Sequence, residues 1–198
     1  MSLELINTLA TFGTFLVIAA TAIAAVVQLR HARSSNHIAA LNELRETMET
    51  PGFQSAQHFV RTQLPAKLQD ASFRYQFANR SARTDETRPL IENAIAVGNF
   101  FENLGVLVKL GLVDKDIASE VWGNLVIDAW KDLEPLVPIS RRDQGNTIWE
   151  NFEYLTVLTQ DWWAAHPTGT YPARVRRIAV KDKFLEADKQ YAAALAPA

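Results

Sequence analysis

The longest unbroken pattern in the chain is apolar and lies close to its start. Residues 5–29 (LINTLATFGTFLVIAATAIAAVVQL) contain no charged side chain. As a helix rising about 1.5 Å per residue, they would extend roughly 37 Å, which exceeds a hydrocarbon core of about 30 Å. The stretch therefore predicts a transmembrane helix with length left for tilt.

A cleaved signal peptide is the alternative interpretation, with the small residues at positions 20–22 as its cleavage site. The segment before the apolar run carries Glu4 and no lysine or arginine, and the run is longer than is typical of signal peptides. Both features favour a retained span. Because Arg30 and Arg33 follow it directly, the positive-inside rule predicts that residues 1–4 lie outside and the remainder lies in the cytoplasm.

Polar residues inside the span recur with a period of seven. Such a period keeps one face toward a neighbouring helix in a left-handed crossing. Small and hydroxylated side chains serve at such contacts because backbones approach closely and hydrogen bonds replace the hydrophobic drive. The alternative is that threonine bonds to its own preceding turn, and Thr8 lies off this face. We favour a helix-packing seam, which consists of Asn7, Ala10, Thr14, Thr21, Ala25 and Gln28.

The rest of the chain has helical periodicity, without the alternation typical of strands. Apolar residues from Ile38 to Met48 step by three or four, so residues 30–50 are predicted to continue the helix beyond the bilayer until Pro51 ends it. The fold class is therefore all-α. One transmembrane helix is followed by a cytoplasmic helical bundle over residues 51–165 and by a helical tail over residues 166–198.

Proline, glycine and polar turns separate the helices expected within these regions. The expected helices cover residues 51–63, 87–110, 114–135, 142–165 and 174–194. The prolines at positions 135 and 138 are expected to end the third of them. Weaker helical turns are expected between residues 66 and 77, and a loop over residues 79–88. Residues 87–110 are apolar on almost every side, which is typical of the buried centre of a domain. Gly111 is expected to end this helix and Asp114 to cap the next.

Composition limits the classes of function. Setting Glu4 aside leaves 21 of the 22 acidic residues against 20 basic ones, a net charge near −1. Nucleic-acid binding would need a strong basic excess. The absence of cysteine excludes disulfides, thiolate metal sites and cysteine nucleophiles. The four histidines are scattered, and no phosphate-binding glycine loop is present. We therefore predict no cofactor, no metal site and no catalytic residue.

One polar group stands out within the apolar helix expected over residues 87–110. Asn99 and Glu102 are three residues apart and share a face, and Asn103 adjoins them. A carboxylate in such surroundings is a candidate for a functional site, because burial would perturb its pKa. The simpler interpretation, which we favour, is that Glu102 pairs with an arginine from another helix, such as Arg61 or Arg74.

Tryptophan is the other conspicuous residue, with five copies. Trp122 and Trp149 fit the apolar faces of their helices. Trp130, Trp162 and Trp163 cannot all face inward, and an adjacent tryptophan pair suggests one buried ring and one at an interface. These three are candidate interface aromatics, although packing in the core is the default interpretation.

Two stretches resemble a known family. They are ETPGFQSAQHFVRTQLP (residues 49–65) and NFFENLGVLVKLGLVDKDIASEVWGNLVIDAWKDLEPLV (residues 99–137). Both are similar to the bacterial family catalogued as domain of unknown function 4760. The matching positions are Pro51, Phe53, Phe59, Val60, Leu64, Phe100, Phe101, Glu102, Gly105, Gly111, Leu112, Asp114, Trp130 and Pro135. The resemblance covers roughly residues 5–165. It implies an all-helical, membrane-associated bacterial protein and no particular activity.

The main hypothesis is a non-enzymatic, single-pass interaction module in the bacterial inner membrane. It would bind the lipid bilayer and assemble with copies of itself or with another membrane protein. One alternative is a membrane-tethered, ligand-binding regulator or a stress or phage-defence component, which predicts an apolar cavity near Glu102. A second is a membrane-associated enzyme with Glu102 as acid or base, which needs another convergent polar group. The sequence names no partner, stoichiometry, ligand or pathway, and gives no role for the tail.

Overall fold

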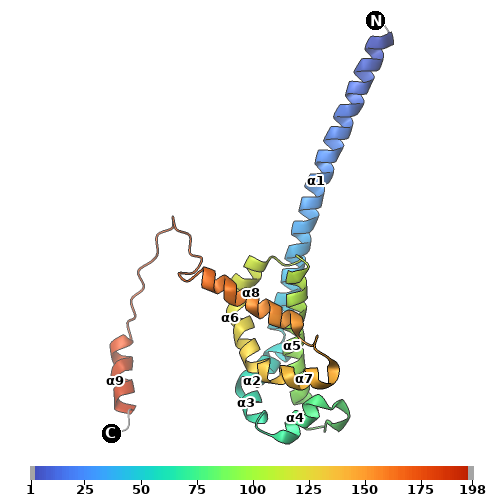
Figure 1. The fold of residues 1–198 in the computed structure, drawn as a ribbon. Helices are drawn as coiled ribbons and strands as arrows, with labels where there is room; N and C mark the ends of the chain where they lie inside the picture. The colour runs from blue at the N-terminus through green and yellow to red at the C-terminus, as the bar shows by residue number, and fades with distance from the viewer. Residues whose placement is uncertain (1–2, 196–198) are drawn as a thin grey trace. The chain divides into compact units, whose positions relative to one another are not determined.

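The computed structural model consists of helices, joined by short connections as far as α8 and by a longer irregular stretch before α9 (Figure 1). It describes residues 3–195, and it describes side chains over residues 11–29, 38–142 and 145–195. The α-helices are α1 (Leu3–Glu49), α2 (Pro51–Thr62), α3 (Leu64–Lys67), α4 (Ala71–Ala78), α5 (Thr87–Lys109), α6 (Lys115–Leu133), α7 (Val137–Gln144), α8 (Glu150–Ala165) and α9 (Leu185–Leu195); the 3-10 helices are η1 (Arg80–Ala82) and η2 (Glu134–Leu136). No strand occurs within residues 3–195, which confirms the all-α prediction.

The expected transmembrane and juxtamembrane helices form one element, α1, which Figure 1 shows as a single unbroken helix. Its stretch Thr11–Leu29 has a mean hydropathy of 2.1, and no part of it is buried. The stretch is long and apolar enough to cross a membrane. Because none of it is buried, the stretch is not a core helix of the bundle.

The junction between α1 and α2 follows the prediction from Pro51. Helix α1 ends at Glu49, and Thr50 takes an extended conformation before the proline. The Thr50 hydroxyl accepts a hydrogen bond from the backbone N–H of Phe53 at 3.3 Å, which caps α2. Proline stands in the first turn of α2, where its missing N–H has no cost.

Helix α5 is the buried centre of the bundle, as its pattern predicts. It packs against α2, α6 and α8. Its buried residues are Ile91, Ala94, Val97, Gly98, Phe100, Phe101, Leu104, Gly105 and Val108. Gly111 follows α5 with a φ of +69°, a left-handed conformation that favours glycine, and the Asp114 carboxylate caps α6 by accepting from the N–H groups of Asp116 and Ile117. Both predicted helix ends are confirmed.

A chain of aromatic rings links four helices through the core. Phe53 of α2 lies 4.7 Å from Phe100 of α5, which lies 5.2 Å from Phe101, measured between ring centroids. Phe101 stacks on Phe152 of α8 at 5.0 Å, and Trp130 of α6 meets Phe152 edge-on at 5.0 Å. Such pairs contribute about 0.5–1.5 kcal/mol each beyond the area they bury. These five rings thus join α2, α5, α6 and α8.

The structure corrects the expected end of the bundle. Helix α6 ends at Leu133, just before Pro135, as expected, but Pro135 and Pro138 also lie in the first turns of two new helices, η2 and α7. The helix expected over residues 142–165 is divided, because α7 ends at Gln144 and α8 begins at Glu150. Gly145 and Trp149 between them have φ values of +93° and +55°, which are incompatible with a continuous helix.

Of the residues that the structure describes, those from 166 to 195 form a second compact unit, separate from the unit that ends at residue 165. A helix was expected from residue 174, but α9 begins only at Leu185. The preceding stretch is irregular, with the Tyr171 hydroxyl donating to the Arg176 carbonyl and the Arg177 guanidinium 4.8 Å from the Tyr171 ring. All residues of this unit from 167 to 195 are exposed, so no apolar face stabilises a longer helix.

Replacing Phe152 should test the aromatic chain. Phe152→Ala removes a fully buried ring that contacts both Phe101 and Trp130. We expect the free energy of unfolding to fall by about 3–5 kcal/mol, measured by urea denaturation of the full chain in mild detergent. The control is Tyr75→Ala on α4, whose side chain is 63% exposed and which should change stability by less than about 0.5 kcal/mol. Equal losses in the two variants would contradict this account of the core.

Candidate functional site

Glu102 supplies the cap of a helix other than its own. Its carboxylate accepts hydrogen bonds from the backbone N–H groups of Asn151 (3.0 Å) and Phe152 (2.8 Å), and from the Asn151 side-chain amide (2.7 Å). Helix α8 begins at Glu150, so these are N–H groups of its first turn, which have no partner within the helix. A negative charge at this end also interacts favourably with the helix dipole.

The prediction that Glu102 pairs with an arginine was therefore wrong. The prediction that Glu102 has a structural role agrees with its hydrogen bonds to α8. Arg61 instead lies 3.7 Å from Asp128, and both side chains are exposed. Arg74 donates to the backbone carbonyl of Leu68 at 2.5 Å. Sequence spacing could not reveal the real partner, because the N–H groups that need a carboxylate appear only where α8 starts.

Asn99 acts on the residue just before α8. Its side-chain oxygen accepts a hydrogen bond from the Trp149 indole N–H at 3.1 Å. The Trp149 ring lies against Gly98, where a Cβ atom would clash with it, and the Asn151 backbone leaves no room for a Cβ at Gly105. The two glycines thus let α5 approach the start of α8 closely, and Asn99 and Glu102 fasten it there.

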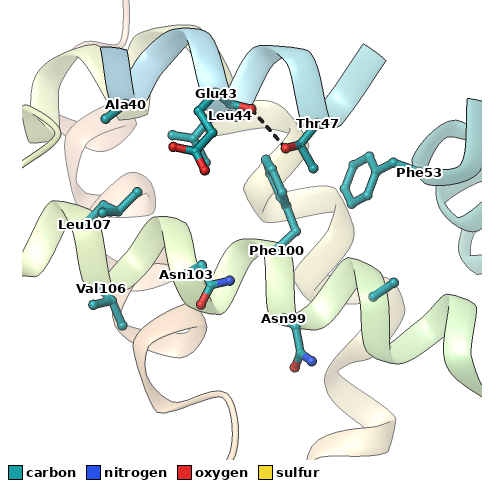
Figure 2. Close-up of a pocket in the computed structure, with 11 residues that line it drawn as sticks. Ala40, Glu43, Leu44, Thr47, Phe53, Asn99, Phe100, Asn103, Val106 and Leu107 are labelled. Atoms are coloured by element: carbon teal, nitrogen blue, oxygen red, sulfur yellow. Dashed lines mark hydrogen bonds between the residues drawn. The ribbon is translucent and has the colours of Figure 1, made fainter. Parts of the chain in front are cut away.

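Asn103, the third residue of the predicted polar site, faces a different space. A groove of about 500 Å³ lies between α1 and α5, and Figure 2 shows Glu43 of α1 and Asn103 of α5 on its two sides. Its lining residues are Ala40, Glu43, Leu44, Thr47, Phe53, Ala96, Asn99, Phe100, Asn103, Val106 and Leu107. The groove is mainly apolar. Asn99 lines this groove and also binds Trp149 just before α8.

A smaller cavity of about 250 Å³ adjoins Glu102 itself. Asn99, Ser140 and Arg83, from the expected loop over residues 79–88, line its polar part. Phe77, Ile95, Ile148 and Trp149 line its apolar part, so the cavity near Glu102 is mixed in character, where the regulator hypothesis predicted an apolar one. Arg83 is the second polar group that the enzyme hypothesis required, but both Glu102 oxygens already accept hydrogen bonds from the start of α8.

The three candidate interface tryptophans are all half-buried. Trp130 packs edge-on against Phe152. Trp163 lies over Gly123 of α6, and Trp162 meets it edge-on at 5.0 Å while donating its indole N–H to the Asp116 carboxylate at 3.0 Å. Trp162 also lines a surface groove of about 460 Å³ along α8. Among these rings, Trp162 is the one placed beside an open groove.

The structure describes part of the predicted seam on α1. Thr14, Thr21, Ala25 and Gln28 are exposed, whereas the side chains of Asn7 and Ala10 lie outside the described residues. The Thr21 hydroxyl donates to the Val17 carbonyl at 2.7 Å, as the alternative interpretation of these threonines expects. A seam at Thr21 would therefore depend on the small size of the side chain. The side chains of Arg30 and Arg33 also lie outside the described residues.

Comparison with known proteins identifies the family. The model of the family described as domain of unknown function (DUF4760) matches residues 15–162. The chain belongs to this family. The match covers most of α1 and nearly the whole bundle, so the Glu102 contact and both cavities beside it lie inside the family domain. No curated protein and no solved structure matches the chain.

Removing the Glu102 carboxylate should weaken the bundle. Glu102→Ala leaves two backbone N–H groups of α8 and the Asn151 amide without their acceptor. We expect a loss of about 1–3 kcal/mol in the free energy of unfolding, with faster hydrogen exchange at the Asn151 and Phe152 amides. The matched control is Glu86→Ala, since the Glu86 side chain makes no capping hydrogen bond to α5. A Glu102→Ala protein as stable as the Glu86→Ala protein would contradict the capping role.

Proposed function

We propose that this protein is a non-enzymatic interaction module of the bacterial inner membrane. In this proposal α1 crosses the bilayer once with the N-terminus outside, and the bundle lies in the cytoplasm. Its partner is a second copy of the chain or another membrane protein, held through the seam on α1. The observation that carries the proposal is that one continuous helix is fully exposed over its apolar half and packed into the bundle over its last turns.

The packed end of α1 supports a rigid connection between anchor and bundle. Leu44 is only 7% exposed and belongs to the hydrophobic core, and Ala40, Leu41 and Met48 pack against that core. No break separates this end from the apolar stretch Thr11–Leu29, since both lie in α1. A rotation or displacement of the span would therefore be transmitted directly to the bundle.

The bundle leaves the seam open for a partner. At about 100° per residue, Thr21 lies roughly 140° around α1 from Leu44, and Thr14 roughly 120°. The helix face that packs on the bundle is therefore different from the face that carries the seam. A partner helix lying along the seam would not have to displace α2 or α5.

The polar groups of the bundle support a non-enzymatic role. Glu102 and Asn99 both bind the segment that starts α8. This use is structural, so neither needs a substrate to explain its presence. The regulator alternative retains the α1–α5 groove in Figure 2 as its support, because one wall of that groove is the anchor helix.

Enlarging a seam residue should disturb assembly. In Thr21→Leu, the added side-chain volume would keep a partner helix from close approach. We expect the variant, extracted in mild detergent, to form smaller particles than the unmodified chain by light scattering, approaching the 22.2 kDa of one chain. The control is Thr8→Leu, the same substitution roughly 140° away from the seam.

Identification of every chain in the particle distinguishes the two kinds of partner. A homo-oligomer gives multiples of the chain mass, whereas an accessory subunit brings other proteins that the Thr21→Leu variant should lose. Particles of unchanged mass and composition in Thr21→Leu would overturn the proposed seam.

The absence of cysteine makes the topology directly testable. Single cysteines introduced as Ser2→Cys and Ser81→Cys would be probed with a membrane-impermeant maleimide on cells whose outer membrane has been opened. We expect Ser2→Cys to react before lysis and Ser81→Cys, in η1, only after it. Cleavage of α1 as a signal sequence would instead remove the label of Ser2→Cys from the mature chain and lower its mass. The reverse labelling pattern would contradict the proposed orientation.

A further inference from the structure

A charged feature apart from the Glu102 contact is a cavity lined by three arginines. It measures about 530 Å³ and lies where η1, the following loop and the first turns of α5 meet. Arg80, Arg83 and Arg88 line it together with Glu92, while Ala78 and Ile95 form its apolar wall. The sequence predicts only a loop over residues 79–88, because the convergence of these arginines depends on how that loop folds.

Arg83 is fixed in place at this cavity. Its side chain donates hydrogen bonds to the backbone carbonyls of Gln76 (3.3 Å) and Phe77 (3.2 Å) at the end of α4. Burial lowers the pKa of Arg83, Arg80 lowers it further, and Glu92 opposes them. Arg83 is therefore a preorganised cation whose charge is partly desolvated, a setting in which it interacts strongly with an anion.

The acidic residues nearby do not balance the arginines. Glu92 is the acidic group among the lining residues. Asp85 lies 3.9 Å from the Arg88 guanidinium and is fully exposed, so this pair is weak. The lining thus has three positive charges and one negative, an excess that suits a ligand with two or more negative charges.

We propose that this cavity, lined by Arg80, Arg83 and Arg88, binds a small soluble polyanion that carries phosphate or carboxylate groups. The planar guanidinium group forms paired hydrogen bonds with both kinds of oxyanion. The cavity volume lies within the range of small-molecule sites. This binding is a further function, independent of the α1 seam.

The position of the cavity favours a soluble ligand over a lipid headgroup. It lies at the first turns of α5, whereas the α1–α5 groove reaches Leu107 near the other end of that helix. Arg88 and Leu107 are 19 residues apart, which corresponds to about 28 Å along α5. In the proposed topology the arginine cavity is thus at the end of α5 away from the span.

Calorimetric titration of the full chain in mild detergent with pyrophosphate, and separately with citrate, tests the proposal. We expect saturable binding of at least one of them, with the dissociation constant raised about tenfold or more in Arg80→Gln and in Arg88→Gln. Tight binding of pyrophosphate alone identifies a phosphate ligand, and tight binding of citrate alone identifies a carboxylate. These two arginines are chosen because Arg83 also holds the end of α4.

The matched control is Arg142→Gln. Arg142 lines a neighbouring cavity with Arg74, so it reports the general effect of one positive charge lost from this region. We expect its affinity for the anion to stay within about twofold of the unmodified chain. The proposal is overturned if neither anion binds saturably. It is equally overturned if Arg142→Gln weakens binding as much as Arg80→Gln and Arg88→Gln do. Unchanged circular dichroism and melting temperature in the three variants confirm that they remain folded.

Discussion

The bundle depends on how α8 is fastened to α5. Helix α8 packs on both α5 and α6. Between α7 and α8, Gly145 and Trp149 have positive φ values, so the helical conformation is interrupted before α8 begins. Its first N–H groups must find acceptors outside the helix, and the Glu102 carboxylate provides them. Because α5 is the central helix, a cap delivered from α5 sets both the start of α8 and its position. The stack of Phe101 on Phe152 then follows from that register.

Helix α1 is likewise held in place by the core at one of its ends. Helix α1 has no hinge of its own between the apolar stretch and Leu44, and the chain first turns at Thr50, where proline forces an extended conformation. The core therefore includes the last turns of α1, where Leu44 is buried. In the proposed function, a partner that packs on the free face of α1 would also set the orientation of the bundle.

Local signals in the sequence predicted much of this fold. Pro51, Gly111 and Asp114 end or cap helices through the chain next to them, so their effects can be inferred without tertiary structure. The break between α7 and α8 could not be inferred from local sequence, because it depends on tertiary contacts of Trp149. This residue has a positive φ, its ring packs on Gly98, and its indole N–H donates to Asn99. The helix expected from residue 174 was wrong because the tail, which is exposed throughout residues 167–195, buries no apolar face. Its weakly helical pattern is not supported by packing, so the helix forms only from Leu185.

The candidate site could also be predicted only where it depends on local sequence and not where it depends on tertiary contacts. Spacing on one helix placed Asn99 with Glu102, but their partners lie about fifty residues away along the chain. The partner of Asn99 is Trp149, in the unexpected break before α8, and Glu102 binds the first turn of α8 itself. The arginines around Arg83 were visible as a polar run, yet their convergence needed α4 and α5 to enclose them.

The cavities along α5 form a contiguous series. Asn99 lines both the α1–α5 groove and the cavity beside Glu102, while Arg83 and Ile95 line that cavity and the arginine cavity. A signal passing along this series would require α5 to have two arrangements, since coupling needs an element that both sites bias. The close contacts at Gly98 and Gly105 allow α5 little movement against the start of α8. The structure therefore favours a rigid α5, which keeps the arginine cavity and the α1–α5 groove at a fixed separation.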